Sequence, residues 1–417
     1  MLFTAYPDEQ LIINQIHEIR NEDYALLRLT PTMIEKNNLD ANSIFRDLLY
    51  SMGIADYNEI EHGGANGIVS DAFFIQSNGT SSVKLKFYRV SNNRGDRRFS
   101  IETIKRKMHN GEMNEGDLLY FSAFKNANGL DKIFIINLTS NTPTKEQIIN
   151  AIGFDEITEK FNEIKPLLQE ILSGGWYDNS KGAGSKASKD VGDTLESLLS
   201  VETNNRNDAD IDGLIEIKSK GIGRTLDTLF TLRPCFEGTP IASVEPNDRS
   251  RVSAFTRKYG YESEKHPKHN SLYITIGSEN APQNNQGFYL EVDDDHNVVN
   301  LIHINQESQI HEITAYWNFQ DLKKQLYDKH PSTLWISADE RMNGDILQFK
   351  YNSIEFSRSP QFMTFLSLIK AGKITYDWRG YTTKLGTYSG KNHGNAWRIK
   401  PNAKSALFGE ISIISFD

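Results

Sequence analysis

Short runs of alternating apolar and polar residues dominate the first third of the chain. Turns rich in Gly and Asn, such as "SNGT" and "ANGL", separate them. Alternation with a period of two gives a strand one buried face, so these runs predict a β-rich module. The stretch "DANSIFRDLLYSMGI" has helical spacing instead. The alternating runs read "YALLRLT", "DAFFIQS", "VKLKFYRV", "DLLYFSAF" and "KIFIINLT".

A strongly helical stretch follows over residues 142–172. Its apolar residues recur with helical spacing, and Thr144 stands where an N-cap would accept the first free backbone N–H groups. The change from strand to helix pattern predicts a domain boundary near residue 150. We therefore expect a β-rich domain over residues 1–150 and a second domain over residues 151–417.

The second domain begins with a Gly/Ser/Lys-rich segment, residues 173–190, that has no periodicity and predicts a flexible loop. The sequence "GDTLESLLSV" then predicts a short helix, and "DGLIEIKSK" predicts a strand. Further strand and helix patterns continue to the C-terminus. This order predicts a mixed α/β domain.

Composition narrows the possible functions. The chain has 417 residues, of which 38% are hydrophobic, which is enough for two cores. Its net charge of -9 and pI of about 5.7 mean that nucleic-acid binding must rest on local basic patches. The single cysteine, Cys235, excludes an intramolecular disulfide and a multi-cysteine zinc site and fits a reducing cytoplasm. No export signal or membrane-spanning segment is apparent, so we expect a cytoplasmic protein.

The predicted strand around residue 216 carries charges beside apolar residues. Side chains alternate in a strand, so Glu216 and Lys218 share one face while Ile215 and Ile217 point into the core. Just before them, Gly213 suits a tight bend that would bring a second carboxylate beside Glu216.

Two aspartates, Asp210 and Asp212, are candidates for that second carboxylate. Two carboxylates, a backbone carbonyl and waters are what Mg²⁺ prefers, and a nearby lysine can orient or deprotonate the attacking water. The same lysine can stabilise charge on a phosphodiester. The pattern matches the D-x(n)-E-x-K arrangement of PD-(D/E)xK nucleases. Alone, the pattern favours a solvated strand edge held by cross-strand ion pairs.

The surrounding segments add a resemblance. "GDTLESLLSVETNN", "DADIDGLIEIKSKG" and "TLFTLRP" resemble, in this order, the MvaI/BcnI family of restriction endonucleases. The segments "SLYITI", "QGFYLEV", "FKY", "IKAGKITYDWR" and "NHGNAWRI" follow in the family's order. The resemblance spans roughly residues 160–410. It implies an α/β (α+β) PD-(D/E)xK nuclease domain with a mixed sheet.

The resemblance also implies site residues. Glu216 and Lys218 correspond to the E and K of the family's motif. Asp210 is favoured as the metal-binding Asp. Asp212 stays a rival, because this chain has one residue more after Gly213 than the family's usual D-x-x-G-x-E. Glu196 resembles the acidic residue that completes such sites; an ordinary surface role is the alternative.

Near the C-terminus, Arg379, His393 and Arg398 correspond to family positions that read bases of a short G/C-centred site. Arginine donates two hydrogen bonds to guanine O6 and N7, and histidine can donate to the same edge. For Arg398, a structural ion pair is the alternative.

A basic stretch stands out in the first domain. Residues 83–107 contain nine Lys and Arg against two acidic residues, interleaved with aromatic residues as in a nucleic-acid groove. A solvated strand pair is the alternative. The order of strands loosely resembles B3-like DNA-binding domains, which implies a β-rich pseudobarrel that adds affinity for DNA or controls the nuclease. The residues concerned include Arg94, Arg97 and Arg98 among the cations and Phe87, Tyr88 and Phe99 among the rings.

Together these features predict a Mg²⁺-dependent type II restriction endonuclease that acts on double-stranded DNA as a monomer, one strand at a time. A cognate DNA methyltransferase is implied, because a sequence-specific nuclease would otherwise cut its host's DNA. A repair-type nicking endonuclease and a non-catalytic DNA-binding protein are the alternatives.

Overall fold

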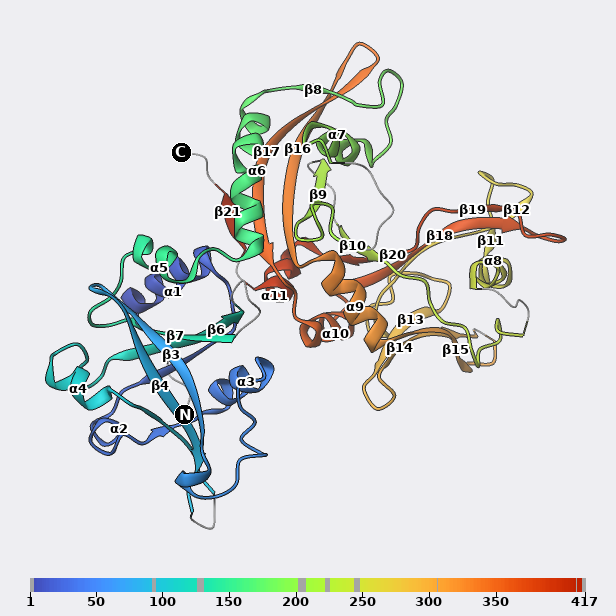
Figure 1. Cartoon of the computed structure of the whole chain (residues 1–417). Helices are drawn as coiled ribbons and strands as arrows, with labels where there is room; N and C mark the ends of the chain where they lie inside the picture. The colour runs from blue at the N-terminus through green and yellow to red at the C-terminus, as the bar shows by residue number, and fades with distance from the viewer. Residues whose placement is uncertain are drawn as a thin grey trace. The chain divides into compact units, whose positions relative to one another are not determined.

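The computed structural model divides the chain into two compact units, Met1–Glu159 and Lys160–Asp417 (Figure 1), each described here by itself. The expected boundary near residue 150 lies in α5 (Lys145–Ile152), the helix before the one that contains the division. The structure describes residues 4–91, 95–125, 131–201, 208–221, 226–243, 248–305, 307–409 and 411–414.

The first unit is built on a seven-stranded sheet with the order β1-β6-β7-β3-β4-β5-β2. The β3/β7 pair is parallel and the other neighbours are antiparallel. This mixed sheet agrees with the expected β-rich module, while the B3-like pseudobarrel stays a prediction. The strands are β1 (Tyr24–Arg28), β2 (Leu39–Asp40), β3 (Ile68–Gln76), β4 (Gly79–Arg89), β5 (Arg97–Ile101), β6 (Leu118–Lys125) and β7 (Asp131–Asn137).

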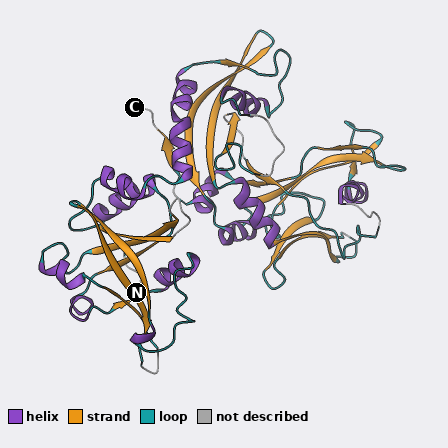
Figure 2. Cartoon of the chain, viewed as in Figure 1, coloured by secondary structure: helices purple, strands orange, loops and turns teal. Residues whose placement is uncertain are grey.

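Helices cover both faces of this sheet, because its central strands are apolar on both sides (Figure 2). In β6, Tyr120 packs with α1 and α5, whereas its neighbour Phe121 packs with α3 on the opposite face. As predicted, Thr144 caps α5, since its hydroxyl accepts the Gln147 N–H. The helices are α1 (Pro7–Ile19), α2 (Pro31–Lys36), α3 (Ser43–Ser51), α4 (Ile104–His109) and α5; α6 (Glu156–Ser173) contains the division between the units.

The second unit contains the charged strand, β9 (Glu216–Gly221), in a five-stranded sheet. The order is β21-β17-β16-β9, and β8 pairs with β17. Strand β9 runs parallel to β16, and the other pairs are antiparallel, so this sheet is mixed. The remaining strands are β8 (Tyr177–Asp178), β16 (Ser332–Asn343), β17 (Ile346–Arg358) and β21 (Ser412–Ile414).

Helix α7 (Asp190–Leu198) lies directly on β9. A Cβ at Gly192 would come within 3.6 Å of Ser219 Oγ, so the backbone of the helix approaches the strand closely. The preceding residues 173–190, expected to form a flexible loop, are held by hydrogen bonds. The buried carboxylate of Asp190 accepts from Asn179 Nδ2, Ser185 Oγ and Ala187 N at 2.7–2.9 Å.

A second sheet of six strands, in the order β10-β20-β18-β12-β11 with β19 beside β18, and a third sheet, β13-β14-β15, complete this unit. Trp317, Trp378 and Trp397 fill the core that they share. The strands are β10 (Asp227–Thr231), β11 (Tyr261–Glu262), β12 (His269–Ile276), β13 (Phe288–Asp293), β14 (Val298–Ile304), β15 (His311–Asn318), β18 (Ile374–Thr383), β19 (Gly390–Asn392) and β20 (Ala396–Ile399). The helices are α8 (Asp248–Tyr259), α9 (Phe319–Lys329), α10 (Phe362–Lys370) and α11 (Lys404–Phe408).

Both units are therefore mixed α+β structures with mixed sheets. Within the residues described, none of the helices combines the length and the apolar character needed to cross a membrane.

Candidate active site and base-reading surface

The charged residues around β9 converge at the start of the strand. The chain turns back between Ile211 and Ile215 in a tight bend whose two central residues, Asp212 and Gly213, have φ values of 51° and 72°. Positive φ at both central positions is the geometry of a type I′ turn, which glycine favours at the second position. The turn brings Asp210 back against the strand, where its Oδ2 accepts the Ile217 N–H at 2.9 Å.

Glu216, the first residue of β9, is only 1% exposed. A buried carboxylate needs partners, and Lys218, on the same face of the strand, donates to Glu216 Oε1. The sequence therefore predicted correctly that these two side chains share a face and that Ile215 and Ile217 are core residues.

Lys329, which the sequence patterns did not single out, completes the cluster. It is the last residue of α9, and its Nζ lies 3.3 Å from Glu216 Oε2 and 3.8 Å from Asp210 Oδ1. It also donates to the Asp208 carbonyl oxygen at 2.9 Å. Lys329 lies 113 residues beyond Glu216, so no local motif could have indicated the contact.

Burial and neighbouring charges shift the pKa values of Asp210 and Lys218. Burial raises the pKa of Asp210, and the nearby Glu216 carboxylate raises it further. Burial lowers the pKa of Lys218, but attraction and hydrogen bonding to Glu216, followed by attraction to Asp210 and Glu196, outweigh burial and raise it. Lys218 is therefore an ammonium ion, which can stabilise negative charge and orient a water molecule but cannot accept a proton.

The other two candidate acids differ in position. Asp212 is 67% exposed and forms an ion pair with Lys160 at 2.9 Å. Glu196 is on α7, which packs on β9, and its charge contributes to the pKa of Lys218. Asp210, Glu216 and Lys218 thus lie together with Glu196 nearby, whereas Asp212 pairs with Lys160.

The donor set fits a hard divalent cation. Two carboxylates, from Asp210 and Glu216, converge on one point of positive charge, the Lys329 ammonium, beside the carbonyl oxygen of Asp208. Oxygen donors of this kind suit Mg²⁺, which keeps several waters and takes one or two protein carboxylates. Across the ranges that the structure describes, no group of three or more His, Cys, Asp or Glu side chains forms a ready-made metal cluster.

A buried aspartate organises the polar face of the second sheet. Asp377 is 2% exposed, and its Oδ2 lies 3.0 Å from Arg379 Nη2 and 2.6 Å from Arg398 Nε. Its Oδ1 accepts from Thr275 Oγ1 at 2.7 Å. Asp377 and Arg379 are two positions apart on β18, so their side chains lie on the same face of the strand. The sequence prediction did not use this spacing.

The two arginines are held differently. Arg379 donates from Nη1 to the carbonyl oxygens of Ile274 and Trp378 and from Nη2 to Thr275 Oγ1. Burial lowers the pKa of Arg379, partly offset by Asp377. Arg398 forms its ion pair through Nε, and no other residue in the described segments pairs with its two Nη groups. The structural ion pair considered for Arg398 is present, and its Nη fork still has donors for a ligand.

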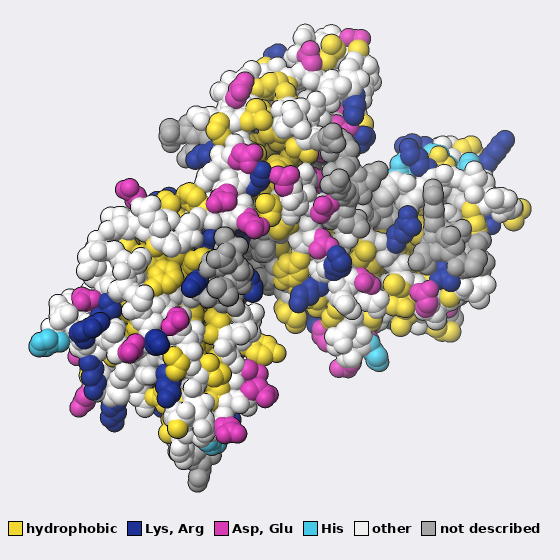
Figure 3. Space-filling model, in the orientation of Figure 1, with side chains coloured by type: hydrophobic (Ala, Val, Ile, Leu, Met, Phe, Trp, Pro, Cys, Tyr) yellow, Lys and Arg dark blue, Asp and Glu magenta, His cyan; other side chains and the backbone are white. Residues whose placement is uncertain are grey.

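Aromatic rings extend this face beyond the arginines. His393, an exposed residue whose N–H donates to the Arg379 carbonyl oxygen, lies with its ring centroid 5.9 Å from that of Tyr273 and 6.3 Å from that of Tyr381. His266 stacks on Tyr381 with centroids 3.9 Å apart. Figure 3 shows Lys, Arg and His side chains gathered at the outer end of the lobe that contains β12, β18 and β19. This face of the second sheet therefore combines arginine hydrogen-bond donors with aromatic and histidine rings.

The comparisons with known proteins identify the family of the chain. The model of the MvaI/BcnI restriction endonuclease family matches residues 166–408, more than half of the chain. The chain belongs to this family. Its predicted membership is thereby confirmed, and the matched range contains every candidate residue on β9, α7, α9, β18 and β20.

Solved structures of the restriction endonuclease MvaI are similar to the chain. The complex of MvaI with its cognate DNA substrate has a TM-score of 0.51 and 26% identity, covering 62% of this chain and 99% of that one. MvaI without DNA has a TM-score of 0.37 and 24% identity, covering 62% of this chain and 98% of that one. A comparison with curated protein sequences found no match.

The first unit lies outside the range matched to the MvaI/BcnI family. Arg97 and Arg98 are neighbours on β5, so they face opposite sides of the sheet. Arg98 forms ion pairs with Asp40 and Asp96, and Arg97 donates to Asn58 Oδ1 at 3.2 Å. Arg94 lies outside the described residues.

The aromatic residues predicted to line a groove in this basic stretch are mostly structural. Phe87 and Phe99 are 0% and 1% exposed and pack in the core of the first unit, so the expectation that they interleave with cations on the surface was wrong. The hydrophobic effect at these alternate strand positions outweighs any surface role. Tyr88 is half-buried and donates to Asn38 Oδ1.

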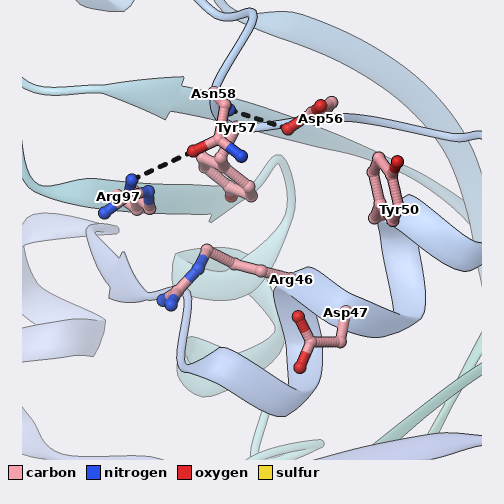
Figure 4. A pocket seen from close by; sticks show the side chains of 7 residues that line it. All are labelled: Arg46, Asp47, Tyr50, Asp56, Tyr57, Asn58 and Arg97. Carbon is pink, nitrogen blue, oxygen red and sulfur yellow. Dashed lines mark hydrogen bonds between the residues drawn. The ribbon is translucent and has the colours of Figure 1, made fainter. Parts of the chain in front are cut away.

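A pocket of about 360 Å³ lies beside Arg97 (Figure 4). Side chains from α3 face the loop after it and β5 across this space. Two arginines and two aspartates lie in its wall, so the pocket offers both donors and acceptors. The lining residues are Arg46, Asp47, Tyr50, Asp56, Tyr57, Asn58 and Arg97.

His330, a buried histidine beside Lys329, should make the free energy of unfolding depend on pH. His330 is 0% exposed, and its ring bonds to the Leu229 carbonyl oxygen at 2.9 Å and to Thr333 Oγ1 at 2.8 Å. A carbonyl only accepts, so Nε2 carries a proton. Burial lowers the pKa of His330 to about 3, and repulsion from Lys218 contributes.

Because this pKa is depressed in the folded state, the stabilising effect of neutral His330 is complete above the unfolded pKa of about 6.5 and is lost as the pH falls from there toward 3. At pH 5 the loss should be about 2 kcal/mol relative to pH 7.5. Urea unfolding at both pH values measures it. His330→Gln should flatten this dependence, whereas His296→Gln, at an exposed position, should not. Equal slopes in all three proteins would contradict the assignment.

Proposed function

We propose that this protein is a type II restriction endonuclease that hydrolyses phosphodiester bonds in double-stranded DNA at a short, G/C-containing site and uses Mg²⁺. One observation carries the proposal: Asp210, Glu216 and Lys218 meet at the start of β9, inside the range matched by the MvaI/BcnI family. Double-stranded DNA as substrate is supported by the similarity to MvaI, whose solved complex contains its cognate DNA.

We assign Asp210 and Glu216 to hold the metal ion and favour Asp210 over Asp212, because Asp210 shares Lys329 with Glu216 whereas Asp212 pairs with Lys160. A bound Mg²⁺ ion would lower the pKa of a water nucleophile and neutralise charge on the phosphate. Lys218, held as an ammonium ion by Glu216, would orient that water and stabilise the developing negative charge. Glu196 would add a further acidic group from α7.

We propose that the polar face of the second sheet reads the bases. Arg398 has an Nη fork that no described residue pairs with, and such a fork matches guanine O6 and N7 in the major groove. His393, near the same face, can donate to that edge. Arg379 is tied to two backbone carbonyls and Asp377, so it reaches a base only by exchanging these partners or acts by orienting Asp377.

Replacing Arg398 by alanine should relax sequence discrimination. One bidentate contact to a base is worth about 1–3 kcal/mol, which is roughly five- to 150-fold in affinity. The measurement is the ratio of Kd values, without Mg²⁺, for a duplex with the cut site and one with a substituted G·C pair. Lys370→Ala, which removes an exposed ion pair with Asp294, is the control. A preserved ratio in Arg398→Ala would refute the base contact.

For the first unit we propose a second DNA-binding role that adds affinity through a raised effective concentration. Its support is the basic stretch that contains Arg94, Arg97 and Arg98, and the polar pocket beside Arg97. We further propose a cytoplasmic monomer, with a cognate DNA methyltransferase as its functional partner.

Supercoiled plasmid assays test the reaction type. The protein should convert unmethylated plasmid to linear fragments in Mg²⁺ and not in excess chelator, and Glu216→Gln should be inactive in both. Cleavage that persists in chelator, or in Glu216→Gln, would contradict the proposal.

A further inference from the structure

Lys329 differs from an ordinary surface lysine because its ammonium lies among three oxygens of the candidate active site. Its ammonium is reached by three oxygens: the Asp208 carbonyl at 2.9 Å, Glu216 Oε2 at 3.3 Å and Asp210 Oδ1 at 3.8 Å. One carbonyl and two carboxylates form the donor set that a hard divalent cation takes. The side chain is 18% exposed, so it lies at the edge of the solvent.

Lys329 supplies the second positive charge facing the Asp210 and Glu216 carboxylates. Asp210 and Glu216 supply two carboxylates, and Lys218 and Lys329 supply two ammonium ions. Glu216 is 1% exposed, and a carboxylate so deeply buried is unfavourable unless its charge is neutralised. Lys218 contacts Oε1 and Lys329 contacts Oε2, so both oxygens are occupied.

The two lysines have different positions relative to the carboxylates. Lys218 forms an ion pair with Glu216, whereas Lys329 lies within 4 Å of both carboxylates. A divalent cation bound by Asp210 and Glu216 would therefore compete for the place of the Lys329 ammonium, and like charges repel at this distance.

The backbone beneath Lys329 is well anchored. The residue ends α9, whose Leu322 and Leu326 are buried, and the next residue, His330, is fixed by its two ring hydrogen bonds. The fold therefore fixes the backbone of Lys329, while four flexible side-chain carbons allow the ammonium to withdraw.

We infer that the Lys329 ammonium occupies the place of the divalent cation between Asp210 and Glu216 in the metal-free protein and thereby limits metal affinity until the metal displaces it. This inference rests on the proposed function, because it takes Asp210 and Glu216 as the metal ligands. Lys329 is a positioning residue: it keeps two like charges together and neutral before the metal binds.

Removing this ammonium should strengthen Mg²⁺ binding. The thermal midpoint is measured against Mg²⁺ concentration without DNA, and the dependence gives the Kd. Lys329→Met should have a lower midpoint than wild type without metal, and its Mg²⁺ affinity should be about tenfold tighter or more, equivalent to roughly 1.4 kcal/mol. Lys329→Arg, which keeps a cation, should retain the weak affinity of the wild type.

Two further variants serve as controls. Lys324→Met, on the same helix but in an exposed pair with Asp328, should behave as wild type. The double variant Lys329→Met with Glu216→Gln should lose the gain in affinity, because it lacks one ligand carboxylate. Unchanged or weaker Mg²⁺ affinity in Lys329→Met, or an equal gain in Lys324→Met, would overturn the inference.

A parallel assay separates this inference from the proposed function. If the wild type cleaves DNA with Mg²⁺ but Lys329→Met shows no gain in Mg²⁺ affinity, the inference fails and the function holds. If Lys329→Met gains affinity but the wild type does not cleave DNA, the proposed function fails. Weaker DNA binding by Lys329→Met with unchanged Mg²⁺ affinity would instead make Lys329 a phosphate contact and also overturn the inference.

Discussion

Replacing Lys218 by alanine should lower the rate of DNA cleavage about a thousandfold, the effect of removing one positioned group that stabilises developing charge. The raised pKa of Lys218 keeps it protonated, so the lost contribution is that of an ammonium ion. DNA affinity should change little, because this side chain is mostly enclosed beside Glu216. Single-turnover cleavage and equilibrium binding, measured on the same duplex, separate the two effects.

The control for this substitution is Lys350→Ala, which removes an exposed lysine from β17 of the same sheet and should leave both quantities unchanged. If Lys218→Ala lost binding and cleavage in equal proportion, Lys218 would have a structural role. If it cleaved at the wild-type rate, the assignment of the E-x-K motif would be wrong.

Asp210→Asn and Asp212→Asn form a matched pair that decides which aspartate binds the metal. Asp210→Asn should lower cleavage at least about a hundredfold, because metal-assisted charge stabilisation contributes several kcal/mol. Asp212→Asn should cleave at nearly the wild-type rate, since its exposed ion pair with Lys160 contributes little to stability. Cleavage rates at saturating Mg²⁺ compare the two.

The reverse outcome, an inactive Asp212→Asn and an active Asp210→Asn, would mean that the turn at Gly213 rearranges when metal and DNA bind. Equal activity of both variants would remove Asp210 from the site.

Strand alternation and helical spacing correctly predicted features that depend on neighbouring residues in the sequence. Strand parity placed Glu216 and Lys218 on one face and Ile215 in the core, and the helical spacing after Thr144 gave α5 and its cap. The family resemblance identified the matched range, which composition and charge alone could not have done.

Contacts between distant segments were not predictable from local patterns. Lys329 reaches Glu216 from another helix, and Asp377 joins two arginines from neighbouring strands. Strand parity does place Phe87 on the apolar face of β4 with Val83 and Leu85, so the wrong prediction came from weighing the basic composition of the stretch above its alternation. The choice between Asp210 and Asp212 depended on turn geometry, where one residue changes the direction of the carboxylate.

The most direct test of the central claim is to incubate the protein with unmethylated phage DNA and Mg²⁺ and to sequence the fragment ends. The account predicts ends that share one short, G/C-containing sequence with both strands cut. Nicks confined to one strand would favour a nicking endonuclease of the same fold. Random ends, or intact DNA, would contradict the identification of a restriction endonuclease.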